Sequence, residues 1–242
     1  MSATDHRGRT ALVLAVLAGH VTCVRVLCAS GADMGVTSEG RTLVHLSLGC
    51  DGNQEDMLRE LVRAGVDVNA RGYANATCLM NVARYGRPEL VRIMCEAGAR
   101  VNATANGLTA LHSASLPLTS NVECVRELLL HGADVDYGVD GDSPLKFACL
   151  TGNADIVQLL LQSGANPTIF DIDSLVPLHH AAAAVALPVV LAMLQEGCLE
   201  TIANFDGTTP FCTVGKETKP PLHRQSRNPV NEAAMRRLLA RG

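Results

Sequence analysis

Short stretches of apolar residues recur along the chain at the spacing of an α-helix. Examples are Val24, Leu27 and Cys28, then Val125, Leu128 and Leu129, then Ile156, Val157, Leu160 and Leu161. Residues three or four positions apart share one face of a helix, so each stretch predicts a short helix with one buried face. Gly19, Gly86 and Gly152 end other stretches, because glycine readily adopts the left-handed conformation that closes a helix. The pattern predicts a series of short helices.

Two sequence marks repeat along the chain with a common period. A Gly-Ala-Asp mark or a variant of it begins at Gly31, Gly65, Gly98, Gly132, Gly164 and Gly197, at intervals of 34, 33, 34, 32 and 33 residues. A second mark, a Thr or a residue in its place, stands at Thr10, Thr42, Thr77, Thr109, Ser143, Val176 and Thr209. Two marks with one period indicate an array of repeats whose neighbours bury one another's apolar faces.

The residues that follow the second mark resemble the ankyrin repeat family and its T-P-L-H-x-A motif. The close matches are Thr109-Ala110-Leu111-His112-Ser113-Ala114, Val176-Pro177-Leu178-His179-His180-Ala181 and Ser143-Pro144-Leu145-Lys146-Phe147-Ala148; Thr42-Leu43-Val44-His45 and Thr77-Cys78-Leu79-Met80 are degenerate. A Thr or Ser can cap the free amides of a helix, and Pro fits its first turn. The resemblance implies an all-α ankyrin-repeat solenoid of stacked helix-turn-helix units with projecting β-hairpin loops.

We expect one ankyrin-repeat domain over residues 1–242. Its seven units are expected at about 5–37, 38–70, 71–103, 104–137, 138–170, 171–203 and 204–242, with extra residues between the helices at 50–53 and 116–120. A proline-rich, basic insert at 216–229 cannot continue a helix and is expected to form a loop. The first helix, residues 11–18, is apolar all round, so we expect upstream chain, a partner or a second copy to cover it.

The composition argues against several classes of function. The 242 residues carry a formal net charge of −4 and only 3% of them are aromatic, which disfavours a nucleic-acid interface or a membrane surface. The 9 cysteines include no CxxC pair, so neither a disulfide framework nor a zinc site is expected. Cys23 and Cys124 lie in apolar helical patterns and are expected to be buried. We therefore expect a protein of a reducing compartment, the cytoplasm or the nucleus.

The sequence lacks the motifs of common enzyme sites. It has no phosphate-binding glycine loop, zinc-protease helix or nucleophile elbow, and we expect no catalytic residue, no cofactor and no metal site. His179 and His180 are adjacent, but neighbours on a helix point in different directions. The resemblance gives His179, like His45 and His112, the role of bracing a hairpin by hydrogen bonds. Cys78 is interpreted as a packing residue, because no base is placed to activate it.

The resemblance also implies where a partner binds. Ankyrin-type stacks bind on a concave face that is built from hairpin tips and the exposed ends of the first helices, a location that rests on analogy. The residues expected there are Arg7, Arg9, Glu39, Arg41, Tyr73, Arg84 and Tyr85 in units one to three, and Asp140, Asp142, Asp171, Asp173, Phe205 and Asp206 in units five to seven. Such a surface would be positive at one end and negative at the other, which orients a partner. Taken singly, each of these charges is more simply interpreted as a solvated surface residue; it is their segregation into two ends that favours a binding surface.

These observations together predict a non-catalytic protein–protein interaction module, either a monomer or part of a longer chain or complex. A more specific version is an adaptor or the substrate receptor of a ubiquitin ligase. An alternative is the regulatory arm of a larger enzyme or channel. A further alternative is that the chain is the substrate of an asparaginyl hydroxylase. Asn69 would be the modified residue, since together with Leu61, Asp67 and Val68 it resembles the substrates of such an enzyme. The more ordinary role of an Asn at this position is to stabilise its turn.

Overall fold

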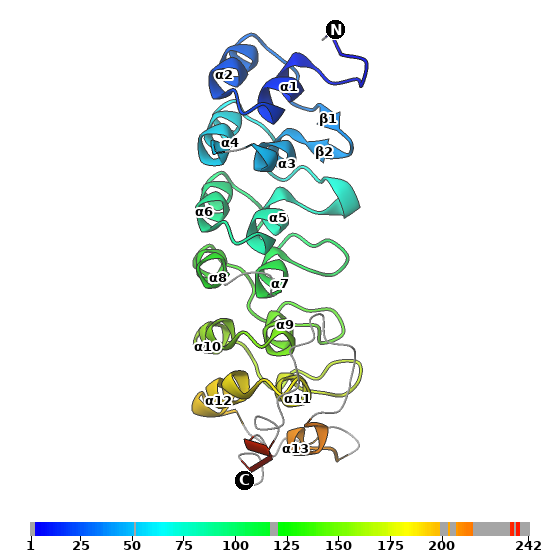
Figure 1. Cartoon of the computed structure of the whole chain (residues 1–242), viewed down its shortest axis with the longest axis vertical. Coiled ribbons are helices and arrows are strands. Elements are labelled where there is room, and N and C mark those ends of the chain that lie inside the picture. The colour runs from blue at the N-terminus through cyan, green and yellow to red at the C-terminus, as the bar shows by residue number, and fades with distance from the viewer. Residues whose placement is uncertain are drawn as a thin grey trace.

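A computed structural model describes residues 3–50, 52–116, 121–198, 203, 207–214, 233–234 and 236–237. Its helices form two columns, and the loops between successive helix pairs project from one side of the first column (Figure 1). The described chain is an elongated stack in which each pair contacts the pairs before and after it. The prediction of an all-α stack of helix pairs with hairpin loops is confirmed.

Each column contains one helix of every pair. The first column consists of α1 (Ala11–Leu17), α3 (Leu43–Leu46), α5 (Cys78–Arg84), α7 (Ala110–Ser115), α9 (Pro144–Thr151), α11 (Pro177–Ala183) and α13 (Pro210–Thr213). The second consists of α2 (Val21–Ala29), α4 (Gln54–Arg63), α6 (Pro88–Glu96), α8 (Val122–Leu130), α10 (Ala154–Gln162) and α12 (Leu187–Gln195). We refer below to the helices of the first column as the first helices.

The hairpins contain little regular strand. In unit two, β1 (Thr37–Ser38) pairs antiparallel with β2 (Arg41–Thr42). In units three and four, single bridges join Arg71 to Thr77 and Ala105 to Leu108. The tip of the third hairpin is a short 3-10 turn, η2 (Tyr73–Asn75).

The first helices begin and end where the repeated marks predict. The hydroxyl oxygen of Ser143 accepts a hydrogen bond of 3.3 Å from the backbone N–H of Lys146, and Thr10 and Thr77 cap their helices in the same way. Gly152 ends α9 in the left-handed conformation, with a φ of 75°. Glycine has no Cβ to clash in this conformation, so the expected helix ends are confirmed.

The turn between the helices of unit six has no glycine at the position that Gly152 occupies in unit five. Val185 lies between α11 and α12 with a φ of 55°, at the position that Gly152 occupies one unit earlier. A β-branched residue is disfavoured in the left-handed region, so this turn is strained. The side chain of Val185 is buried in the core, and the apolar surface that it removes from water offsets part of the strain.

The hydrophobic core is continuous along the stack. It forms one cluster of buried side chains from Leu12 in the first unit to Val214, the residue that follows α13. The predicted stripes lie at its centre, where Val24, Val125, Leu128, Val157 and Leu160 are fully buried. A single helix pair on its own would leave this apolar stripe exposed to solvent. The stability of the chain therefore comes from the contacts between neighbouring units.

The first unit leaves part of this stacking face uncovered. The predicted burial of Cys23 is wrong: its side chain is exposed, whereas the residues at the same place in later units, Leu90, Cys124 and Ile156, are buried. Val26 on the same helix is 63% exposed. The physical reason is that no helix pair of the described chain packs against this side of α2.

The longer units differ from the others between their helices. In unit two, α3 has only four residues and continues as a 3-10 helix, η1 (Ser47–Gly49), before the extra residues predicted at 50–53. Of the extra residues predicted in unit four, 117–120 lie outside the described chain, as does the insert predicted at 216–229.

Candidate functional site

The hairpins are anchored to the helices by buried histidines. Nε2 of His112 lies 2.7 Å from the carbonyl oxygen of Asp142, and Nε2 of His179 lies 2.9 Å from that of Thr208. Both carbonyls belong to the next unit, so the predicted bracing role is confirmed for these two residues. His45 differs, because its buried Nε2 makes no hydrogen bond of normal geometry with the described residues, although the backbone of Ala76 in the next unit still interacts with the ring. Burial lowers the pKa of all three imidazoles, which favours their neutral form.

The third unit presents two exposed aromatic side chains. Tyr73, at the hairpin tip, is 81% exposed, and Tyr85, which follows the last residue of α5, is 65% exposed. Arg84 is exposed beside Tyr85. A helix rises 1.5 Å per residue, so α5 separates the hairpin from Tyr85 by about 10 Å. Tyrosine and arginine are the residue types that most often anchor a protein interface.

The hairpin that carries Tyr73 is fixed by Arg71. Nη1 of Arg71 donates hydrogen bonds to the carbonyl oxygens of Asn75, at 2.8 Å, and of Thr104, at 2.7 Å. The first bond closes the hairpin on itself, and the second ties it to the hairpin of the next unit. Sequence reasoning missed this residue, because a lone arginine outside a motif has the pattern of any solvated surface charge.

The positive end of the expected binding surface is partly neutralised. Nη2 of Arg9 lies 2.7 Å from Oδ2 of Asp5, and Nη2 of Arg41 lies 3.0 Å from Oε2 of Glu39. Hydrogen bonds from Arg9 lower the pKa of Asp5 to about 2. Arg7 is exposed. The positive field in units one and two is therefore weaker than the count of arginines suggests.

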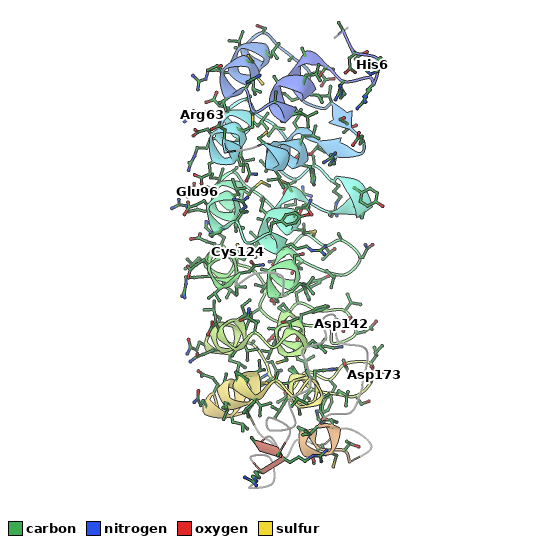
Figure 2. All side chains as sticks on the ribbon, viewed as in Figure 1. His6, Arg63, Glu96, Cys124, Asp142 and Asp173 are labelled. Carbon is green, nitrogen blue, oxygen red and sulfur yellow. The ribbon has the colours of Figure 1, made fainter. Side chains whose placement is uncertain are left out.

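The expected negative end lies on the hairpins of units five and six. Asp140 and Asp173 are exposed, and Asp142 is half exposed with its Oδ1 2.6 Å from Nζ of Lys146. Figure 2 shows Asp142 and Asp173 on neighbouring hairpins at the same side of the stack. The last two expected residues, Phe205 and Asp206, lie outside the described part of the chain.

The expectation that Asp171 faces a partner is wrong. Its carboxylate is fully buried, and its Oδ2 lies 2.7 Å from both Nζ of Lys146 and Nε2 of His180. Burial alone would raise the pKa of Asp171, but the hydrogen bonds from His180 and Lys146 outweigh it and lower the pKa. The sequence places Asp171 beside exposed residues of the hairpin, and only the three-dimensional packing turns its side chain inward.

Asn69 links two units through both ends of its amide. Its Nδ2 donates to the carbonyl oxygen of Gly98 at 3.1 Å, and its Oδ1 accepts from the backbone N–H of Arg100 at 2.7 Å. Asn102 makes the same pair of bonds one unit later, to Gly132 and Asp134. These bonds favour the turn-stabilising role for both residues.

Other candidate chemistry finds no support in the described residues. Burial raises the pKa of the Cys78 thiol to about 12, so the thiol stays protonated and packs as an apolar group. Across the described chain, no three His, Cys, Asp or Glu side chains gather as metal ligands. None of the described helices has the length and apolar character needed to cross a membrane.

Comparison with known proteins gives a consistent picture. The family model described as ankyrin repeats (3 copies) matches residues 1–72, 50–137, 79–171 and 119–204. A B-cell lymphoma 3 protein homolog of Mus musculus is 32% identical over 169 residues, which cover 65% of this chain and 36% of that protein. The E3 ubiquitin-protein ligase KEG of Arabidopsis thaliana is 29% identical over 227 residues, 86% of this chain and 14% of that protein.

A solved structure extends the likeness to nearly the whole chain. The crystal structure of the ankyrin repeat domain of Bcl-3, described as a unique member of the IkappaB protein family, has a TM-score of 0.76 and 26% identity. It covers 98% of this chain, and this chain covers 100% of that domain. By contrast, the chain spans about a third or less of the length of the curated relatives named above.

Proposed function

Since this chain belongs to the ankyrin repeat family, we propose that it is a non-catalytic module that binds a segment of a partner protein on the surface formed by its hairpins and first helices. The observation that carries the proposal is the exposure of Tyr73 and Tyr85 in the third unit, with Arg84 between them in sequence. Large aromatic side chains exposed on a rigid scaffold are typical of interface anchors.

Charge supports an orientation for the bound segment. Arg7 and Arg84 stand toward one end of the stack, while Asp140 and Asp173 are exposed toward the other. A partner segment that is acidic near Arg84 and basic near Asp140 is favoured in one direction along the surface and disfavoured in the other. Long-range fields of this kind change the association rate more than the final affinity, and added salt weakens them.

The proposal extends to the oligomeric state, the compartment and the type of partner. The module acts as a monomer or within a longer chain in the cytoplasm or nucleus, with a protein partner and neither nucleic acid nor membrane as its ligand. One relative is named an E3 ubiquitin-protein ligase, which supports the adaptor and substrate-receptor version of the proposal. The alternative is a regulatory arm of a larger enzyme or channel. In that case the same surface binds another domain of its own protein.

Hydroxylation of Asn69 is the weaker of the proposed roles. A hydroxylase must reach a side chain whose Nδ2 and Oδ1 are both bound to the next unit. Modification would therefore require these two bonds to open first. The intact bonds favour the turn-stabilising role, and the binding surface does not depend on this residue.

The test compares capture of partners by wild-type chain and by a charge-reversed variant, Arg41→Glu with Arg84→Glu. Proteins captured from lysate are identified by mass spectrometry, then purified and measured for direct binding to both chains. We expect a partner whose affinity for the variant falls by at least about tenfold, with the loss reduced at high salt. Leu130→Ala is the matched control, because Leu130 is an exposed side chain at the end of α8 in the second column.

Two results would overturn the proposal. Equal affinity of wild type and the Arg41→Glu, Arg84→Glu variant would show that the partner binds elsewhere. Loss of binding by the Leu130→Ala control, with the charge reversal silent, would move the site to the second column of helices.

A further inference from the structure

The tip of the third hairpin has an unusual backbone. Ala74 and Asn75 both have positive φ angles, 55° and 61°. The other hairpins with two such residues in succession place glycine second, at Glu39-Gly40, Asn106-Gly107 and Asp140-Gly141. Two left-handed residues without glycine are strained, and strain of this kind persists only where surrounding contacts hold it.

Contacts on both sides hold this hairpin in place. On one side, Gly72 packs against the buried ring of His45 so closely that a Cβ on Gly72 would lie 2.8 Å from the ring. On the other side, Arg71 donates to the carbonyl oxygen of Thr104 in the fourth hairpin. Tyr73 follows directly and stays 81% exposed. The hairpin is thus fixed from both neighbours while its aromatic side chain faces solvent.

The charge around Tyr73 is positive. The guanidinium of Arg71 donates to carbonyl oxygens, and these neutral acceptors do not cancel its charge. On the preceding hairpin, Glu39 is paired with Arg41. The following hairpin, residues 101–108, contains no charged side chain. No carboxylate of these three hairpins is therefore left to balance Arg71.

We infer that the third hairpin, residues 71–77, is a preformed docking element for an acidic segment of a partner protein, with Tyr73 as its anchor. The inference rests on the proposed function and adds the chemical character of the bound segment, which is acidic. An aromatic or large aliphatic side chain of the segment covers the ring of Tyr73, and an adjacent Asp or Glu pairs with Arg71. Arg71 acts also as a positioning residue, since a fixed hairpin loses little entropy when it binds.

The test selects a random peptide library, displayed on phage, against the whole chain. We expect the enriched peptides to combine Asp or Glu with an aromatic or large aliphatic residue. Tyr73→Ala should weaken their binding by at least about 30-fold, as loss of an interface anchor does. Arg71→Lys keeps the positive charge but not the pair of hydrogen bonds to the two carbonyl oxygens. We expect this variant to bind the peptides on the order of tenfold more weakly. The Ala76 amide should also exchange faster with solvent.

The outcomes separate this inference from the proposed function. Enrichment of basic peptides, no enrichment, or equal binding by wild type and Tyr73→Ala overturns the docking element. If the peptides lose affinity for Tyr85→Ala and Arg84→Glu but keep it for Tyr73→Ala, the proposed surface stands and the hairpin inference fails. Unchanged binding by Leu130→Ala is required as the control in every arm.

Discussion

Oδ2 of Asp171 lies 2.7 Å from Nζ of Lys146, and both side chains are buried where unit five meets unit six. Lys146 occupies the motif position that histidine fills in units four and six. In place of a hydrogen bond from an imidazole to a carbonyl, this junction has an ion pair between a helix of one unit and the hairpin of the next.

This pair predicts strong coupling in a double-mutant cycle. Lys146→Met leaves the carboxylate of Asp171 buried without its cation, and we expect a loss of about 3 kcal/mol in the free energy of unfolding. The variant with both Lys146→Met and Asp171→Leu removes both charges and should be more stable than Lys146→Met alone. Urea denaturation of the four proteins measures the coupling, and strictly additive losses would contradict a direct interaction.

A second prediction concerns the close approach of two hairpins at Gly141. A Cβ on Gly141 would lie 2.1 Å from the backbone oxygen of Phe170, whereas Gly132, with a similarly positive φ, has open space around it. Both Gly→Ala variants incur the left-handed penalty, about 1 kcal/mol, but only Gly141→Ala also forces the hairpins apart. We expect Gly141→Ala to be the less stable of the two by at least about 2 kcal/mol. Equal midpoints of thermal unfolding would show that the hairpins do not touch here.

The buried histidines predict a dependence of stability on pH. Burial lowers the folded-state pKa of His45, His112 and His179 below the unfolded value of about 6.5. The unfolded chain then binds more protons than the folded chain as the pH falls through 6.5, so stability is full above this pH and declines below it. Denaturation midpoints between about pH 7.5 and 5 measure the slope, and His112→Gln should make it shallower. A stability that rises on acidification in this range would contradict the neutral, buried state of these rings.

The turn role of Asn69 can be separated from its modification. Asn69→Ala removes two hydrogen bonds between units and should lower the free energy of unfolding by about 1 kcal/mol. Asn69→Asp keeps the acceptor for the Arg100 amide but loses the donor to Gly98, so we expect an intermediate effect. Native-state hydrogen exchange checks the same bonds, since the Arg100 amide should exchange faster in both variants. If Asn69→Ala is as stable as wild type, the turn-stabilising role is wrong.

The sequence predicted the fold because repetition made each feature visible several times. The capping role of Ser143, the helix-ending Gly152 and the bracing by His112 and His179 all follow from short local patterns that recur at one period. Features that occur once were missed or predicted wrongly. The left-handed Val185 is one of them, because the repeat pattern does not mark a valine as a residue that ends a helix.

The site was less predictable than the fold, because exposure depends on contacts between units. Asp171 and Asp173 lie two residues apart in the same hairpin, yet one is buried and the other exposed. Arg9 and Arg41 add two positive charges when the sequence is counted, but each forms an ion pair with a nearby carboxylate. These pairings depend on side-chain geometry, which the repeat pattern does not specify.

The most direct test of the account is a hydrogen-exchange footprint of the chain with and without its purified partner. We expect slower exchange on binding in the hairpins and at the end of α5, around Tyr73, Arg84 and Tyr85. Helices α4, α6 and α8 of the second column should exchange at the same rate in both samples. Protection confined to the second column, or to the exposed side of α2 around Val26, would contradict the claim that this protein binds its partner through hairpins and first helices.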